Sequence, residues 1–378
     1  MATTQRGALF RRITGAAICG VLLATTSACA LTGGGNSGSA ATESAASVSG
    51  AAVVGTGTVP VYPTPEPLVE GSAASLDKIA FKGGTPTIAY LPMGTEFNYH
   101  LALFEGIKSV PGAESFMLSP YSGSDQAAQL GMLQDATSRD DVDAILLISF
   151  DEHSLAPLVQ KAVDAGKVVI IINSDIPNYP TPVDGVVGVT QRTANKALAQ
   201  WAVEQSNGEA KQVGILDGEP SYLATERAGG FTDGIEGSNW TVAARISGGW
   251  SVEKGNTAAM DMLQAHPEIT VLFASNDYMA EGAALAAKAL GRTDLTILGY
   301  DGDTAAIESI AEDGGVTATT NTSPIKMGAM AAQYAIDLLN KKAAVGYINA
   351  PTEIVTKENA TTILQDPDSL FPKPSREF

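Results

Sequence analysis

The sequence predicts an α/β protein built from two lobes, each with a parallel sheet that helices cover on both faces. The first observation is a series of short, almost wholly apolar segments that alternate with amphipathic ones from residue 86 onward. Strands that are buried on both faces have such continuous apolar sequences and are typical of parallel sheets. The second observation is that the alternation stops at residue 188 and restarts at residue 212, which indicates two blocks, each the size of one domain.

The predicted elements follow the chain in order. Apolar, β-branched runs predict strands at residues 87–91, 144–148, 168–172, 212–216, 241–246, 269–273, 295–298 and 352–356. A helix is predicted between the two blocks at residues 190–205. A later helix is indicated by apolar residues at helical spacing, namely Met327, Met330, Ala331, Tyr334 and Leu338. We interpret this stripe of Met and Tyr as core packing.

The first 28 residues are predicted to be a signal peptide. Three arginines precede an apolar stretch at residues 13–24, which has the length of a signal-peptide core and is short for a membrane span. Small residues at 26–28 precede Cys29 and resemble the cleavage box of a bacterial lipoprotein. We expect lipid on Cys29 to anchor the protein to the outer face of the cell membrane. The alternative is an ordinary secreted protein with a spare cysteine.

Residues 29–84 are predicted to be a disordered tether. This segment is rich in Gly, Ser, Ala and Thr and then in Pro. Such a composition buries little apolar surface, so it does not offset the entropy lost on ordering. The Pro-rich part is expected to be stiffer and more extended than the Gly/Ser-rich part.

The composition excludes several classes of protein. The chain has 23 Lys+Arg against 41 Asp+Glu, a net charge of −18, which argues against a nucleic-acid partner. Its two cysteines and three histidines match no metal-ligand spacing, so we expect neither a metal nor a cofactor. The sequence has no Gly-x-Ser-x-Gly elbow, and glycosidic cleavage needs a placed carboxylate pair. We therefore expect a protein that is not an enzyme. We also expect it to be a monomer.

Polar and aromatic residues follow nearly every predicted strand. Ligands of open α/β sheets bind at the carboxyl ends of strands, in the crevice between lobes. Asn, Asp and Arg can each bond two neighbouring sugar hydroxyls, and Trp or Tyr can pack against the C–H face of a sugar ring. The candidate ligand contacts are Tyr99, His100, Asn173, Ser174, Arg227, Trp250, Asn276 and Asp301. Tyr99 and Trp250 are expected to sandwich the ring.

Several of these residues have structural alternatives. Arg227 could form a surface ion pair with Glu226 or Glu219, which would contribute little stability. Asp301 could be a turn residue, and Trp250 could close the core. The neighbouring Asp277 is expected to cap a helix rather than to bind ligand.

The strand-end motifs resemble those of periplasmic sugar-binding proteins of the ribose-binding type, which are the solute receptors of ABC importers. The resemblance covers residues 85 to 355 and is most specific at residues 265–283, with further matches at 226–231 and 299–302. It implies two Rossmann-like lobes with parallel sheets joined by a three-crossover hinge, the type I periplasmic binding protein fold. The N-terminal lobe would comprise residues 85–189 plus 324–349, and the C-terminal lobe residues 190–323 plus 350–378.

The resemblance also assigns residue roles. It places Arg227, Asn276 and Asp301 on ligand-binding positions and Trp250 on an aromatic stacking position. Tyr99 and His100 occupy a pair that is usually two phenylalanines. Asn173-Ser174 stands where an aspartate followed by Arg or Ser is usual, and Thr322 stands where a glutamine is usual. Because of these two departures, the resemblance assigns no particular sugar.

The implied function is capture of one small sugar or polyol by hinge closure and its delivery to an ABC permease and its ATPase. One alternative is a sensory or quorum-signal receptor of the same fold that passes its bound state to a membrane kinase. Another is the effector domain of a transcription factor. The signal peptide and the lack of a basic helix-turn-helix argue against the latter.

Overall fold

The computed structural model describes residues 53–54, 59–119, 125–149, 151–176, 178–366 and 370–371. The predicted signal peptide, Cys29 and the first part of the predicted tether lie outside the described residues. Within the described part, no helix combines the length and the apolar character that crossing a bilayer requires.

The described residues form two sheets, the first of which has the strand order β1-β3-β2-β4-β5-β6-β12. Its strands are β1 Val53–Val54, β2 Thr87–Leu91, β3 Glu114–Met117, β4 Ala144–Leu147, β5 Val168–Ile172, β6 Gly185–Gly188 and β12 Gly346–Asn349. Neighbouring strands are parallel except for β1, which pairs with β3 in the antiparallel sense. We call this sheet with its helices the N-terminal lobe.

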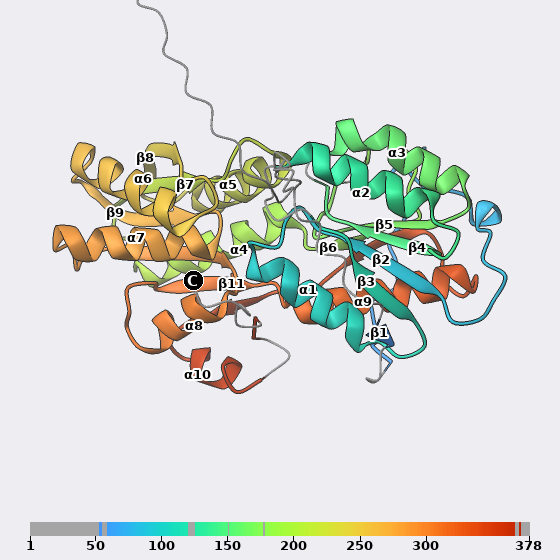
Figure 1. The fold of residues 1–378 in the computed structure, drawn as a ribbon. Helices are drawn as coiled ribbons and strands as arrows, with labels where there is room; N and C mark the ends of the chain where they lie inside the picture. The colour runs from blue at the N-terminus through green and yellow to red at the C-terminus, as the bar shows by residue number, and fades with distance from the viewer. Residues whose placement is uncertain are drawn as a thin grey trace, which may run out of the picture. The chain divides into compact units, whose positions relative to one another are not determined.

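Helices cover both faces of the first sheet, as the continuous apolar strands predict. Helices α1 (Asn98–Ser109) and α9 (Pro324–Leu339) lie on one face, and α2 (Gln126–Ser138) and α3 (Glu152–Asp164) lie on the other (Figure 1). Alternate strand residues point to opposite faces. Leu146 therefore belongs to the core beneath α1 and α9, whereas Ile145 belongs to the core beneath α2 and α3.

Helices α1 and α9 approach each other closely enough for their backbones to touch. A Cβ atom on Gly106 would lie 1.9 Å from the carbonyl oxygen of Ile325, and one on Gly328 would lie 2.1 Å from that of Leu103. On α9, Met327 and Tyr334 are fully buried. The interpretation of the Met/Tyr stripe as core packing is confirmed.

The second sheet has the strand order β13-β11-β10-β9-β7-β8. Its strands are β7 Lys211–Asp217, β8 Trp240–Ser247, β9 Ile269–Ala274, β10 Thr296–Asp301, β11 Ala318–Asn321 and β13 Glu353–Val355. One face packs on α4 (Gln191–Gln205) and α5 (Tyr222–Ile235). The other packs on α6 Val252–Ala265, α7 Asp277–Leu290, α8 Thr304–Ala311 and α10 Ala360–Ile363. We call this sheet with its helices the C-terminal lobe.

The chain passes between the two sheets three times. The first crossing follows β6 and leads into α4, the second follows β11 and leads into α9, and the third joins β12 to β13. Two mostly parallel sheets with three connections between them confirm the predicted fold class.

Five of the described strands were not predicted from the sequence. One is the two-residue β1; the other four, β3, β6, β11 and β12, each have four residues and contain polar or glycine residues. The run Gly185–Gly188, for example, has only two valines between glycines. Short runs of this kind carry too little hydrophobic periodicity to separate a strand from a loop.

The structure differs from the predicted tether over residues 59–84, which lie against the N-terminal lobe. Glu66 exchanges two backbone hydrogen bonds of 2.7 Å with Tyr347 at the sheet edge. The Tyr62 hydroxyl donates to Asp337 Oδ2 at 2.7 Å, and Ala73 forms a bridge to Val183. Composition predicted disorder here because it does not register backbone pairing with an available strand edge.

Candidate ligand-binding site

A cavity of about 610 Å³, partly continuous with solvent, lies between the two lobes where the parallel strands end. Its lining residues are Met93, Phe97, Tyr99, His100, Asn173, Leu223, Arg227, Trp250, Asn276, Asp277, Tyr278, Asp301, Asp303 and Phe371. The structure thus brings together every candidate contact except Ser174 and Thr322. Their role in binding stays a prediction.

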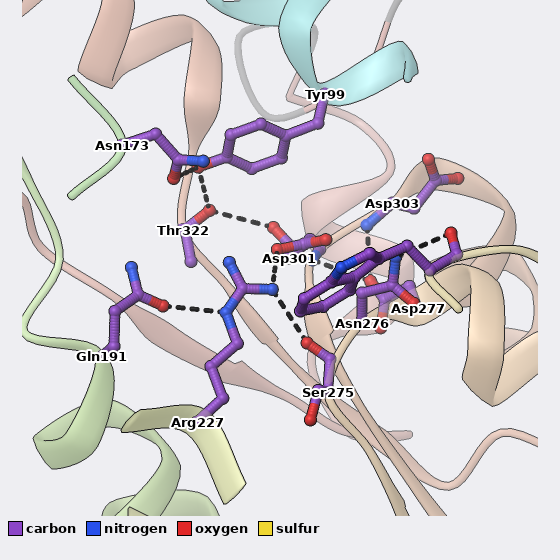
Figure 2. A network of polar contacts seen from close by, with 12 residues as sticks. Tyr99, Asn173, Gln191, Arg227, Ser275, Asn276, Asp277, Asp301, Asp303 and Thr322 are labelled. Atoms are coloured by element: carbon purple, nitrogen blue, oxygen red, sulfur yellow. Dashed lines mark hydrogen bonds and ion pairs between the residues drawn. The ribbon is translucent and has the colours of Figure 1, made fainter. Parts of the chain in front are cut away.

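Arg227 on α5 places a buried positive charge at the cavity. The residue is only 4% exposed. Its Nε donates to Gln191 Oε1 at 2.9 Å, and its Nη1 donates to the carbonyl oxygen of Ser275 at 2.8 Å (Figure 2). Nη1 also lies 3.1 Å from Asp301 Oδ1. Since no hydrogen bond in the described part of the chain uses Nη2, that nitrogen can donate to a ligand.

The surface ion pair considered for Arg227 does not form in the structure. Glu226 instead lies 3.6 Å from Arg192, and Glu219 lies 3.3 Å from Lys254. The Arg227 guanidinium faces inward, with its central carbon 4.2 Å from the centre of the Tyr300 ring. This position favours the ligand-binding interpretation over the surface one.

Asp301 ends β10 in a strained backbone conformation. Its φ of 120° lies in the region that favours glycine. Burial raises the pKa of the Asp301 carboxyl to about 6, and the neighbouring Arg227 opposes this rise. Two other cavity residues, Asn173 and Trp250, have φ values of 56° and 62°. Strained residues of this kind cluster at binding sites, which supports a functional role for the cavity.

Asp277 organises the loop that carries Asp301. Its Oδ2 accepts hydrogen bonds from the backbone N–H groups of Gly302 at 2.8 Å and Asp303 at 2.7 Å. Its Oδ1 accepts from the Thr319 hydroxyl at 2.6 Å. Burial, with the nearby Asp301 charge, raises the pKa of Asp277 well above its usual range. The side chain therefore holds two segments of the C-terminal lobe together beneath the cavity.

The expected helix cap at Asp277 is wrong by one residue. Asn276 is the N-cap of α7, because its Oδ1 accepts from the backbone N–H of Met279 at 3.0 Å. Its Nδ2 donates to the carbonyl oxygen of Trp250 at 3.3 Å. Sequence alone does not separate two adjacent residues that both favour the cap position. Asn276 thus combines the cap with a place in the cavity wall.

Tyr99, Asn173 and Thr322 form a hydrogen-bonded cluster on the opposite side of the cavity (Figure 2). The Tyr99 hydroxyl donates to Asn173 Oδ1 and lies 3.0 Å from both that atom and Thr322 Oγ1. Thr322 Oγ1 in turn donates to the Asp301 carbonyl oxygen at 3.2 Å. Asn173 and Thr322, the residues at the two unusual positions, therefore both contact the Tyr99 hydroxyl, and Thr322 reaches the cavity through Tyr99.

His100 is held as a neutral imidazole. The residue is 5% exposed, and its Nδ1 lies 2.8 Å from the carbonyl oxygen of Gly94. A carbonyl oxygen only accepts, so Nδ1 carries the proton and Nε2 keeps its lone pair. Burial lowers the pKa of His100 to about 4. At neutral pH this side chain can accept one hydrogen bond from a ligand.

Trp250 is fixed against the backbone of Gly218. A Cβ atom at position 218 would lie 1.8 Å from Trp250 Cζ2, so only glycine leaves room for the indole. Further aromatic residues of the wall are Phe97, Tyr278 and Phe371. Together they supply the apolar surface that the face of a sugar ring requires.

Several cavity residues were not predicted from the sequence. Asp303 lies within the run that follows β10, so the strand-end rule could have selected it. Phe371 gave no signal, because it follows the last predicted element. Its ring meets that of Tyr99 edge-on with centres 5.7 Å apart, and its backbone N–H donates to Thr304 Oγ1 at 2.8 Å. Phe371 thus contacts both lobes.

Ser174 lies in a second hollow that adjoins the cavity. This hollow has a volume of about 1270 Å³ and shares Met93, Asn173 and Trp250 with the cavity wall. The Ser174 Oγ accepts from the backbone N–H of Ile176 at 3.3 Å. The structure therefore places Ser174 beside the cavity rather than in its wall.

The two lobes also touch directly at the edge of the cavity. The backbone N–H of Asn98 on α1 donates to the Tyr278 hydroxyl on α7 at 3.1 Å. The rings of Phe97 and Tyr278 lie nearly parallel, with centres 6.5 Å apart. These contacts join the lobes beside the residues that line the cavity.

Comparison with known proteins finds similarity to periplasmic solute-binding proteins. The periplasmic binding protein domain family matches residues 88–343. The chain is 33% identical over 225 residues to the D-ribose/D-allose-binding protein of Pseudomonas aeruginosa, which is 57% of this chain and 70% of that protein. It is 29% identical over 217 residues to a ribose import binding protein of Bacillus subtilis, again 57% of this chain and 70% of that protein.

A solved structure supports the same fold. The ABC transporter solute binding protein of Mycobacterium smegmatis with bound glycerol has a TM-score of 0.69 and 24% identity, covering 76% of this chain and 99% of that one. Two α/β lobes with a polar and aromatic cavity between them define a solute-binding protein. The chain belongs to the periplasmic binding protein domain family, a family of binding proteins rather than enzymes. The resemblance found in the sequence is confirmed.

Proposed function

We propose that this protein captures a small sugar or sugar-like polyol outside the cytoplasm and delivers it to an ABC importer. The observation that carries the proposal is the cavity between the lobes, where the paired Arg227 and Asp301 lie among aromatic side chains. A guanidinium donates to hydroxyl oxygens, and a carboxylate accepts from hydroxyl hydrogens. The aromatic rings cover the C–H surface that remains.

The names of similar proteins support this ligand class. The Pseudomonas relative is named for D-ribose and D-allose, and the Bacillus relative for ribose import. The Mycobacterium structure contains glycerol and is described as part of an ABC transporter. All three ligands are small and carry adjacent hydroxyls. Together with the cavity chemistry, they favour a neutral polyhydroxylated ligand and an importer as partner.

The proposed mechanism is hinge closure. Ligand contacts come from both lobes, with His100 on α1 and Arg227 on α5. A ligand that contacts both lobes binds the closed state more tightly and shifts the population toward it. The three connections between the sheets supply the hinge. An importer that recognises the closed form would then receive the loaded protein.

The proposed location is the outer face of the cell membrane. The support is sequence alone: the apolar stretch at residues 13–24 and the small residues before Cys29. Lipid on Cys29 would hold the folded lobes near the importer. The residues that follow Cys29 would set the distance between the folded lobes and the membrane.

A thermal-shift screen tests the proposed function. We expect at least one of D-ribose, D-allose, glycerol or related pentoses, hexoses and polyols to raise the melting temperature of the protein. A ligand present at about 1,000 times its Kd adds about 4 kcal/mol to the free energy of unfolding. Isothermal titration should then give one site per chain. If no sugar or polyol stabilises the protein at about 10 mM, the proposed ligand class is wrong.

Ligand affinity should depend on pH through Asp301. Because the pKa of this carboxyl is about 6, it is ionised at pH 8 and mostly protonated at pH 5. The ionised form accepts from ligand hydroxyls and pairs with Arg227, so affinity should fall about tenfold as the pH falls from 7 to 5. His100, with a pKa of about 4, stays neutral over this range. Titration calorimetry at several pH values measures the profile, and an affinity that rises toward pH 5 would contradict it.

A further inference from the structure

A carboxylate at the α8 end of the cavity has one oxygen that accepts no hydrogen bond from any described residue. Asp303 follows Gly302 and is the N-cap of α8, where its Oδ1 accepts from the backbone N–H of Ala305 at 2.9 Å. Its own backbone N–H donates to Asp277 Oδ2 at 2.7 Å. The residue is 5% exposed and lines the cavity. Both its backbone and one side-chain oxygen are thus fixed in place.

The second oxygen, Asp303 Oδ2, is buried and has no hydrogen-bond partner in the described part of the chain. The other two carboxylates of the cavity wall, Asp277 and Asp301, differ in this respect. Both oxygens of Asp277 accept hydrogen bonds, and Asp301 is paired with Arg227. Buried polar atoms nearly always have a partner. An unsatisfied carboxylate oxygen in the wall of a ligand cavity therefore indicates that the partner is a group of the ligand.

The surroundings of Asp303 favour a donor. Glu281 on α7 is close enough for the Asp303 charge to raise its pKa, although burial is the larger cause. The Oε1 of Glu281 is also buried without a partner among the described residues. A ligand atom that only accepts hydrogen bonds would be repelled by the Asp303 carboxylate, whose side chain lines the cavity. A hydroxyl hydrogen directed at Asp303 Oδ2 would satisfy it.

We infer that Asp303 Oδ2 accepts a hydrogen bond from a hydroxyl of the bound ligand and is a specificity-determining contact. The inference rests on the proposed function. It requires a ligand with hydroxyl groups at two separate places, one bound by Arg227 and Asp301 and the other directed toward the N-terminus of α8. A sugar that lacks the second hydroxyl, or carries it as a methyl ether, would leave Oδ2 unsatisfied. Sites built to bond a hydroxyl reject such analogues strongly.

Two substitutions remove this oxygen while keeping the helix cap. Asn and Ser are both good N-cap residues, so Asp303→Asn and Asp303→Ser should fold with nearly wild-type melting temperatures. The first replaces the acceptor by an N–H donor, and the second removes it. Titration with the sugar of the screen that binds the wild type most tightly should show an affinity about 10- to 100-fold lower for both variants.

The matched control is Asp125→Asn in the full-length protein. Asp125 is also an N-cap aspartate, with its Oδ1 accepting from the backbone N–H of Ala128 at 2.8 Å, but it belongs to α2 and lies outside the cavity wall. Its substitution should leave ligand affinity unchanged. Equal losses in the Asp125 and Asp303 variants would show that changing a cap, rather than a ligand contact, weakens binding, and would overturn the inference.

Monodeoxy derivatives of the same sugar identify the hydroxyl. The wild type should bind one of these derivatives about 10- to 100-fold more weakly than the parent sugar. The Asp303→Ser variant should bind that derivative and the parent sugar with equal affinity. Wild-type affinity in both Asp303 variants would overturn the inference and leave the proposed function intact, because Oδ2 would then be satisfied by water or a proton. Failure of every sugar and polyol to bind the wild type would instead overturn the proposed function and, with it, this inference.

Discussion

Arg227→Ala is expected to reduce sharply the rise in melting temperature that the ligand causes. The substitution removes the free Nη2 donor and leaves Asp301, whose side chain is 16% exposed, without its cation. Truncating one partner of a buried, hydrogen-bonded charge pair costs about 2 to 5 kcal/mol in binding, which is more than tenfold and up to several thousandfold in affinity. The ligand-free protein should also lose about 3 kcal/mol of stability. Thermal shift and titration calorimetry measure both effects.

Arg192→Ala is the matched control. Arg192 lies on the adjacent α4 and pairs with Asp233 at 2.6 Å, but its side chain is 44% exposed. Exposed pairs contribute about 0 to 1 kcal/mol, so this variant should bind and melt like the wild type. Arg227→Lys is a second test in case the alanine variant does not fold. It keeps the positive charge but lacks the planar set of donors, so its ligand affinity should still fall about tenfold. Wild-type affinity in both Arg227 variants would contradict the site.

Asp277→Ala is expected to weaken both folding and binding, although Asp277 need not touch the ligand. Its carboxylate satisfies the backbone N–H groups of Gly302 and Asp303 and the hydroxyl of Thr319. Leaving such buried donors unsatisfied costs about 1 to 3 kcal/mol each, so unfolding in urea should show a loss of about 3 kcal/mol or more. The loop that carries Asp301 and Asp303 should lose its fixed position, and affinity should fall with it.

Asp277→Asn separates the role of the hydrogen bonds from that of the charge. The amide oxygen can take the place of Oδ2 and accept both backbone N–H groups. The amide nitrogen can then donate to Thr319 Oγ1, since a hydroxyl both donates and accepts. We expect a stability and an affinity close to those of the wild type. A loss as large as that of Asp277→Ala would show that the negative charge, rather than the hydrogen-bond pattern, holds the loop.

The fold was predictable because its strands are buried on both faces. Runs such as Val168–Ile172 are wholly apolar, and their alternate residues belong to two different cores. The short strands β6 and β12, by contrast, pair with each other at the sheet edge and contain little apolar sequence. Their pairing depends on residues far apart in the chain. The packing of residues 59–84 was missed for the same reason.

The candidate site was predictable where residues directly follow long strands. Asn276 and Asp301 lie at the cavity, as their positions at the ends of β9 and β10 indicated, and Arg227 reaches the cavity from α5. The interactions among them were not predictable. The hydrogen bond between Tyr99 and Asn173 joins residues 74 positions apart, and that between Tyr99 and Thr322 spans 223 positions. Phe371 belongs to no strand-end motif, and its role depends on where the C-terminal segment passes.

A crystal structure with the sugar that binds most tightly tests the central claim most directly. We expect one sugar in the cavity between the lobes, with Arg227 and Asp301 within hydrogen-bond distance of its hydroxyls and an aromatic ring against its C–H face. Residues of both lobes should contact it. A sugar bound elsewhere on the protein, or a cavity filled by side chains in the presence of saturating sugar, would contradict the account.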